Sequence, residues 1–119
     1  MIQKDKSILW HMIKYCTEVS ETITIMGLDF EKFAASHIAR NSISMCILQI
    51  GELARKLSDD IKKKYTEIPW QSAISMRNRA AHGYYTMDIA TIWNTACIDA
   101  PILKSYCEKI LEEIDNERP

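Results

Sequence analysis

The chain has 119 residues, 47% of them hydrophobic and 26% charged, and contains only 3 Gly and 3 Pro. This length fits a single domain, residues 1–119, and the scarcity of turn-forming residues favours a few long helices. The formal net charge of −1, from 15 Lys and Arg against 16 Asp and Glu, excludes an overall positive field that would attract nucleic acid, so any RNA binding depends on a local patch.

The first predicted element is an amphipathic helix, with apolar residues at three- and four-residue steps between Ile8 and Met26. Asp5 is its predicted N-cap, and Gly27 ends it. The opening residues, MIQKDKSILWHMIKYC, have neither an uninterrupted apolar run nor a small-residue cleavage site, and no segment approaches the ~20 apolar residues that cross a bilayer. We therefore expect a cytoplasmic protein with no membrane contact.

A longer amphipathic helix is predicted from Asp29 to Leu57, again from apolar residues at three- and four-residue steps. A bend is expected near Ser42 or Gly51. Ser58, followed by two aspartates, is the predicted N-cap of a short third helix that runs to about Tyr65.

A fourth helix is predicted to open at Ile68-Pro69-Trp70, because proline suits a first helical turn, and to end near Gly83. A last helix begins at Asp88, is kinked by Pro101 and carries its apolar stripe to Ile114. No segment has the alternating pattern of a strand. The expected fold is all-α, an up-and-down bundle of four main helices plus a short one.

The cysteines and histidines predict no metal site. The four cysteines are far apart, form no C-x-x-C pair and each fall on the apolar side of a helix: Cys16, Cys46, Cys97 and Cys107. They are expected to be buried, reduced thiols. The histidines outside the segment described next also lack ligand partners at helical spacing, so neither a zinc site nor a cofactor is expected.

The densest group of chemically active side chains lies in MRNRAAHGYYTMD, residues 76–88. On a helix, Asn78 and His82 share one line, whereas Arg77 lies on a neighbouring line. Arg77 and His82 are five positions apart, which is about 140° around an ideal helix. The two side chains meet only if the helix unwinds at Gly83, so that His82 swings toward Arg77.

This group of residues suits the cleavage of RNA. It has no pair of acid–base carboxylates, no Gly-rich phosphate loop and no nucleophilic Ser or Cys beside the histidine. In RNA the 2′-hydroxyl is itself the nucleophile, so histidine need only move protons and arginine need only stabilise charge on the phosphate, without a metal. The same residues also fit an ordinary helix end, with Tyr84 and Tyr85 as core rings. Chemistry alone leaves both interpretations open.

The segment RNRAAHGYY resembles the R-x4-H-x-Y motif of the HEPN superfamily, specifically the HepT-like toxins of type VII HepT/MntA toxin–antitoxin pairs. Three longer stretches resemble the same family: LQIGELARKLSDD in the second helix, IPWQSAISMRNRAAHGYY through the fourth and IWNTACIDAPILKSY in the last. Together they extend the resemblance over nearly the whole chain.

The resemblance implies a HEPN-like, all-helical homodimer that acts as a metal-independent endoribonuclease, with tRNA among the family's targets and a 2′,3′-cyclic phosphate as product. Carried over by position, Arg77 and His82 are the catalytic pair and Asn78 supports them. Tyr84 is the motif tyrosine, to which a cognate MntA-like nucleotidyltransferase antitoxin adds AMP. Tyr85 lies off the motif and is expected to be structural.

A homodimer also has a physical use. One chain supplies a single motif histidine, whereas in-line phosphoryl transfer needs both a base and an acid. Our hypothesis is that two fourth helices face each other and combine both copies of Arg77 and His82. Trp10, Trp70 and Trp93 are expected in the core or in this interface.

Other charged residues have two interpretations each. Glu52 and Arg79 are possible supporting residues of the site. Glu52 is either a buried partner that holds Arg77 or Arg79, or an exposed helix glutamate. The basic residues at 55–56 and 62–64 form either a local RNA-binding patch or a solvated face. The alternative function is a non-catalytic helical interaction or nucleotide-binding module that partners a nucleotidyltransferase.

Overall fold

The computed structural model describes residues 2–116, and every regular element in that range is a helix. The elements are α1 (Ile2–Met26), α2 (Phe30–Ala35), α3 (His37–Lys56), α4 (Asp59–Lys64), α5 (Trp70–Thr86), α6 (Ile89–Asn94), the π-helical segment η1 (Thr95–Asp99) and α7 (Ala100–Asn116). The all-α prediction is confirmed. Besides the four long helices α1, α3, α5 and α7, the described chain has three short α-helices and a π-helical turn, where a single short helix was predicted.

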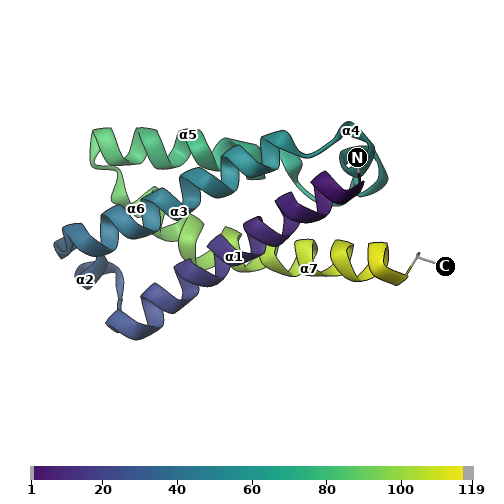
Figure 1. The fold of residues 1–119 in the computed structure, drawn as a ribbon. Helices are drawn as coiled ribbons and strands as arrows, with labels where there is room; N and C mark the ends of the chain where they lie inside the picture. The colour runs from purple at the N-terminus through teal and green to yellow at the C-terminus, as the bar shows by residue number, and fades with distance from the viewer. Residues whose placement is uncertain (1, 117–119) are drawn as a thin grey trace.

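The long helix α3 lies at the centre of the bundle. It packs on one side against α5 and on another against α1, which in turn packs against α7. Figure 1 shows the four long helices running in alternating directions, with the start of α1 and the end of α7 at the same end of the bundle as α4. An ion pair of 2.8 Å between Lys6 and Asp115 joins those two helix ends.

The hydrophobic core follows the predicted apolar stripes. Its largest fully buried side chains come from α1, α2, α3, α5, α6 and α7: Leu9, Met12, Phe33, Ile43, Ile47, Ile50, Met76, Ile92 and Ile110. Burying one such side chain stabilises the fold by about 1.5–3 kcal/mol. No helix within residues 2–116 is both long enough and apolar enough to cross a membrane.

Asp5 does not cap the first helix as predicted, because α1 already begins at Ile2. Its carboxylate is buried and accepts hydrogen bonds from Ser58 N at 3.0 Å and Ser58 Oγ at 2.6 Å. Ser58 caps α4 as predicted, since its Oγ accepts from Ile61 N at 3.3 Å. Asp5 therefore fixes the start of α4 against α1.

The predicted second helix is two helices, which meet at Ser36. Asp29 caps α2 by accepting from Lys32 N at 2.8 Å, and Ser36 caps α3 by accepting from Ala39 N at 3.1 Å. Because the Ser36 hydroxyl satisfies a free amide of the new helix, the chain can leave one helix and start another at this residue. The break between helices thus falls at Ser36, whereas α3 is continuous from residue 37 to 56 through Ser42 and Gly51, where a bend was predicted.

The fourth predicted helix, α5, continues past Gly83 to Thr86. The following Met87 has the left-handed φ of 62°, a conformation that ends helices. Gly83 has a packing role instead, because a Cβ there would lie 2.9 Å from both the Asp88 carbonyl oxygen and Ile92 Cγ1. The glycine lets α6 fold back closely against α5.

The kink predicted at Pro101 is a π-helical turn just before it. The amide of Ala100 donates to the Thr95 carbonyl, five residues back, and Figure 1 shows the chain changing direction between α6 and α7. A π turn adds a residue to the helix and so shifts the side chains by about 100°. Cys97 is consequently exposed, so the prediction that all four cysteines are buried is wrong for this one.

The three tryptophans have different surroundings. Trp70 is buried, and its Nε1 donates to the Tyr65 carbonyl at 2.9 Å. Trp93 packs on Phe33 with ring centroids 5.0 Å apart. Trp10 is 60% exposed, so it is not a core residue, and its predicted place in a dimer interface stays a prediction.

The backbones of α3 and α5 approach each other closely at Gly51. A Cβ at this position would lie 2.8 Å from Arg77 Cβ and 2.9 Å from Arg77 Cα, closer than real Cβ contacts occur. Glycine at residue 51 therefore sets the spacing of the two helices and places residue 77 directly on α3.

We expect Gly51→Ala to destabilise the protein by about 2 kcal/mol, even though alanine gains about 1 kcal/mol in helix propensity. The added methyl meets backbone atoms, which cannot rotate away, so the two helices must separate. The free energy of unfolding in urea measures the effect, with Ser42→Ala on the exposed face of α3 as the matched control. A Gly51→Ala protein as stable as the control would show that the close approach is not needed.

Candidate functional site

Arg77 is held at the surface of α5 by two neighbouring side chains. Its Nε lies 3.2 Å from Glu52 Oε1 on α3, and its Nη1 donates to Asn78 Oδ1 at 3.2 Å. The expected ion pair with Glu52 is present, and it exists because Gly51 brings the two helices together one residue earlier. Within the described chain no hydrogen bond engages Nη2, so this edge of the guanidinium faces solvent, ready for an anion.

Glu52 is ionised at neutral pH and holds two arginines. The hydrogen bond from Arg55 Nη2, at 3.1 Å, together with the charges of Arg55 and Arg77, lowers the pKa of its carboxyl group. The carboxylate is partly exposed, so the pair with Arg77 contributes little to stability. Its effect is to fix the direction of the guanidinium.

His82 points away from Arg77 within one chain. Because α5 is helical through Thr86, the two residues stay about 140° apart around its axis. Thr86 Oγ1 donates to the His82 carbonyl at 2.7 Å, which ties this residue into the last turn. The predicted unwinding at Gly83 is therefore wrong, and one chain assembles Arg77, Asn78 and Glu52 but leaves His82 on another face of the helix.

Arg79 belongs to a separate network on the side of η1. Its Nη1 donates to Asp99 Oδ2 at 2.8 Å and to Thr95 Oγ1 at 3.0 Å, and its Nη2 donates to the Ser72 carbonyl at 2.9 Å. These bonds fasten α5 to the π-helical turn. Arg79 was predicted as a possible support for Arg77, but it fixes the rotation of α5 instead and does not touch Glu52.

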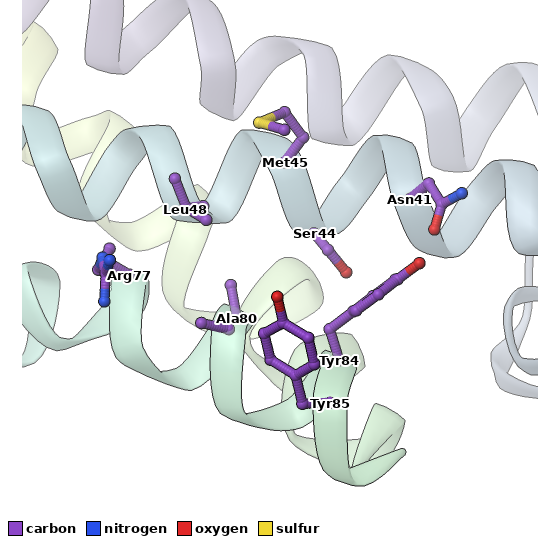
Figure 2. A pocket seen from close by; sticks show the side chains of 9 residues that line it. Asn41, Ser44, Met45, Leu48, Arg77, Ala80, Tyr84 and Tyr85 are labelled. Atoms are coloured by element: carbon purple, nitrogen blue, oxygen red, sulfur yellow. The ribbon is translucent and has the colours of Figure 1, made fainter.

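A cavity of about 370 Å³ opens between α3 and α5 beside Arg77. Four residues of α3 and five of α5 line it: Asn41, Ser44, Met45, Leu48, Arg77, Ala80, Ala81, Tyr84 and Tyr85. Figure 2 shows the two tyrosine rings projecting from α5 at one end of the cavity and Arg77 at the other. The α3 residues were missed in the sequence because polar side chains at helical spacing are usually on a solvated face.

Tyr84 and Tyr85 are surface residues. They are 47% and 85% exposed, and their rings meet nearly at right angles, 6.0 Å apart. The interpretation of these rings as core residues is therefore wrong. Both are available to a ligand or a modifying enzyme.

The basic residues of α4 lie away from this cavity, at the end of α3 where the chain turns into α4 (Figure 1). Lys62 Nζ donates to the Arg55 carbonyl at 3.2 Å and so caps the C-terminal end of α3. At least this lysine has a local structural role.

The described residues show no arrangement for a metal or a thiolate nucleophile. Within residues 2–116, no three His, Cys, Asp or Glu side chains are grouped to hold a metal ion. Burial raises the pKa of Cys16 to about 12 and that of Cys46 to about 11, and it also raises the pKa of Cys107. These three thiols stay protonated at neutral pH.

Comparison with known proteins connects this site to a family. The family model described as "Ribonuclease HepT-like" matches residues 5–110. The chain is 29% identical over 112 residues to "Putative RNase MJ0125" of Methanocaldococcus jannaschii, covering 94% of this chain and 95% of the relative. It is 28% identical over 101 residues to "Probable ribonuclease HepT" of Thermococcus cleftensis, covering 81% of this chain and 92% of the relative. No solved structure matches the chain significantly. The resemblance found in the sequence is thus confirmed, and the protein belongs to the HepT-like ribonuclease family.

Proposed function

We propose that this protein is an endoribonuclease in which Arg77 and His82 carry out the reaction. The observation that carries the proposal is the exposed guanidinium of Arg77, fixed by Glu52 and Asn78 at one end of a cavity in a HepT-like ribonuclease chain. An oriented cation with one edge free suits a phosphate. His82 is exposed on the same helix, so it is accessible to RNA as a proton donor or acceptor.

The proposed cleavage reaction conserves protons and bonds without a cofactor. The RNA 2′-oxygen attacks the adjacent phosphorus and loses its proton to one imidazole, while the bond from phosphorus to the 5′-oxygen breaks and that oxygen receives a proton from a second imidazole. The products are a 2′,3′-cyclic phosphate and a 5′-hydroxyl. Arg77 stabilises the charge on the five-coordinate phosphate.

The site is completed by a second copy of the chain. A continuous α5 directs Arg77 and His82 to different sides, and each chain has one His82, whereas the reaction uses a base and an acid. In a homodimer with the two α5 helices facing each other, His82 of one copy lies opposite Arg77 of the other. Met87, an exposed apolar side chain at the end of α5, is suited to such a contact.

The biological role we propose is that of the toxin in a type VII toxin–antitoxin pair, with tRNA as a target. A cognate MntA-like nucleotidyltransferase antitoxin adds AMP to Tyr84. Tyr84 lines the same cavity as Arg77, so the added group fills part of that cavity with a bulky anion and obstructs RNA bound along it.

Arg77→Ala and His82→Ala are each expected to lower the rate of RNA cleavage by at least about 100-fold, the size of a general acid–base or charge-stabilising contribution. Their melting temperatures should stay within a few degrees of the wild type, because both side chains are exposed and the Arg77 ion pair is weak. His11→Ala, an exposed histidine on α1, is the matched control. Full cleavage by His82→Ala would instead favour a non-catalytic module that partners a nucleotidyltransferase.

Mixed dimers test the shared site. When wild-type chains are mixed with an excess of His82→Ala chains and allowed to exchange, the cleavage rate per wild-type chain should fall to well below half, because mixed dimers retain only one of two imidazoles. The same excess of His11→Ala chains should leave it unchanged. A rate per wild-type chain that does not depend on added His82→Ala would mean that one chain is sufficient.

Tyr84→Phe is expected to escape modification when co-expressed with an MntA-type nucleotidyltransferase, whereas the wild type and Tyr85→Phe should gain mass in AMP increments. The measurement is intact mass, followed by peptide mapping of the modified wild type. Modification of Tyr84→Phe to the same extent as the wild type would place AMP on another residue.

A further inference from the structure

We infer that the cavity between α3 and α5 is a nucleobase subsite, which selects RNA by the base next to the cleaved phosphate. The inference rests on the proposed ribonuclease function for its biological meaning. Three structural observations support the subsite: a buried hydroxyl without a hydrogen-bond partner, an aromatic and apolar lining, and the position of Arg77.

The strongest indication is the hydroxyl group of Ser44. This residue is only 7% exposed, and its Oγ is buried without a hydrogen-bond partner. A helical serine commonly donates to the carbonyl four residues back, yet Ser44 makes no such bond. Figure 2 shows the hydroxyl directed from α3 toward the two tyrosine rings. An unpartnered buried hydroxyl destabilises a fold, so its presence at a cavity wall points to a ligand that completes the bond.

The lining of the cavity suits a flat heteroaromatic ring. Met45, Leu48 and Ala80 provide apolar walls, and the rings of Tyr84 and Tyr85 stand at the mouth. Proteins bind unpaired RNA bases by stacking them on aromatic side chains and reading their edges through a few hydrogen bonds. A volume of about 370 Å³ lies within the range of small-molecule sites.

The polar side chains of the cavity can contact both the base edge and the phosphate of a bound nucleotide. Asn41 offers an amide donor and a carbonyl acceptor at the tyrosine end, and Ser44 offers a hydroxyl between the rings and α3. Arg77 stands seven residues before Tyr84, about 10 Å along the helix at 1.5 Å per residue. A phosphate on Arg77 thus leaves the base of a neighbouring nucleotide within reach of Ser44 and Asn41.

A second copy of the chain is a less suitable occupant of this cavity. The exposed methionines nearby, Met45 and Met87, would offer Ser44 no strong hydrogen bond, so its hydroxyl would remain without a partner. A base edge carries donors and acceptors and also stacks, so it satisfies the hydroxyl and the rings together.

The test is an NMR titration with four homotrinucleotides, of A, C, G and U, whose 2′-O-methyl groups remove the nucleophile and prevent cleavage. The wild type should bind one of them at least about tenfold more tightly than the weakest. Ser44→Ala and Asn41→Leu should reduce this preference to less than about threefold. Ser42→Ala, an exposed serine of α3 outside the cavity, should retain it. Ser44→Ala should melt no lower than the wild type, since it removes an unsatisfied group.

The outcomes separate this inference from the proposed function. RNA cleavage with equal binding of all four trinucleotides, unchanged by Ser44→Ala, overturns the subsite and leaves the ribonuclease. A base preference that Ser44→Ala removes, in a protein that cuts no RNA, supports the subsite and overturns the ribonuclease. Failure to bind any trinucleotide, with Tyr85→Lys converting dimers to monomers, would make the cavity a contact between two chains and overturn the subsite.

Discussion

The close contact of α3 and α5 at Gly51 is the constraint on which the rest of the site depends. Because glycine lets the backbone of Arg77 rest on α3, Glu52 in the next position reaches the guanidinium and fixes its direction. The same contact sets the distance between the helices, and so the width of the cavity that Ser44, Tyr84 and Tyr85 line. The absence of a side chain at Gly51 thereby determines the positions of the Arg77 guanidinium and of the cavity wall.

Two further contacts fix how α5 is rotated. Arg79 donates hydrogen bonds to Asp99 and Thr95. At Gly83, the absence of a side chain lets Ile92 pack closely against the backbone of α5. Both lie on the sides of α5 turned toward η1 and α6, so Arg77 and the tyrosines are left on the open side. The π-helical turn takes part in this arrangement, since it presents Thr95 and Asp99 to the same guanidinium. Because α5 stays helical from Trp70 to Thr86, Arg77 and His82 do not converge within one chain.

Much of the fold could be predicted from the sequence, because three- and four-residue apolar spacing and capping residues such as Ser58 are local signals. The predictions were wrong where a residue far away in the sequence determines the local conformation. Asp5 looked like a cap but is bound by Ser58, 53 residues away, and Gly83 looked like a helix end but serves the packing of α6. For the site, the motif indicated Arg77, and Glu52 was one candidate partner for it. The contribution of α3 through Ser44 depends on how the two helices meet.

Three features that reduce stability lie around the C-terminal half of α5. Met87 adopts a left-handed conformation that costs a residue other than glycine about 1 kcal/mol or more, Ser44 has an unsatisfied hydroxyl, and Tyr85 exposes most of an aromatic ring. Elsewhere in the described chain, capped helix ends and buried apolar stripes agree with local signals, although Asp5 is bound by Ser58 and Trp10 is exposed. Sequences depart from such agreement mainly where function requires it, so these features favour the cavity over the α4 lysines as the proposed binding surface.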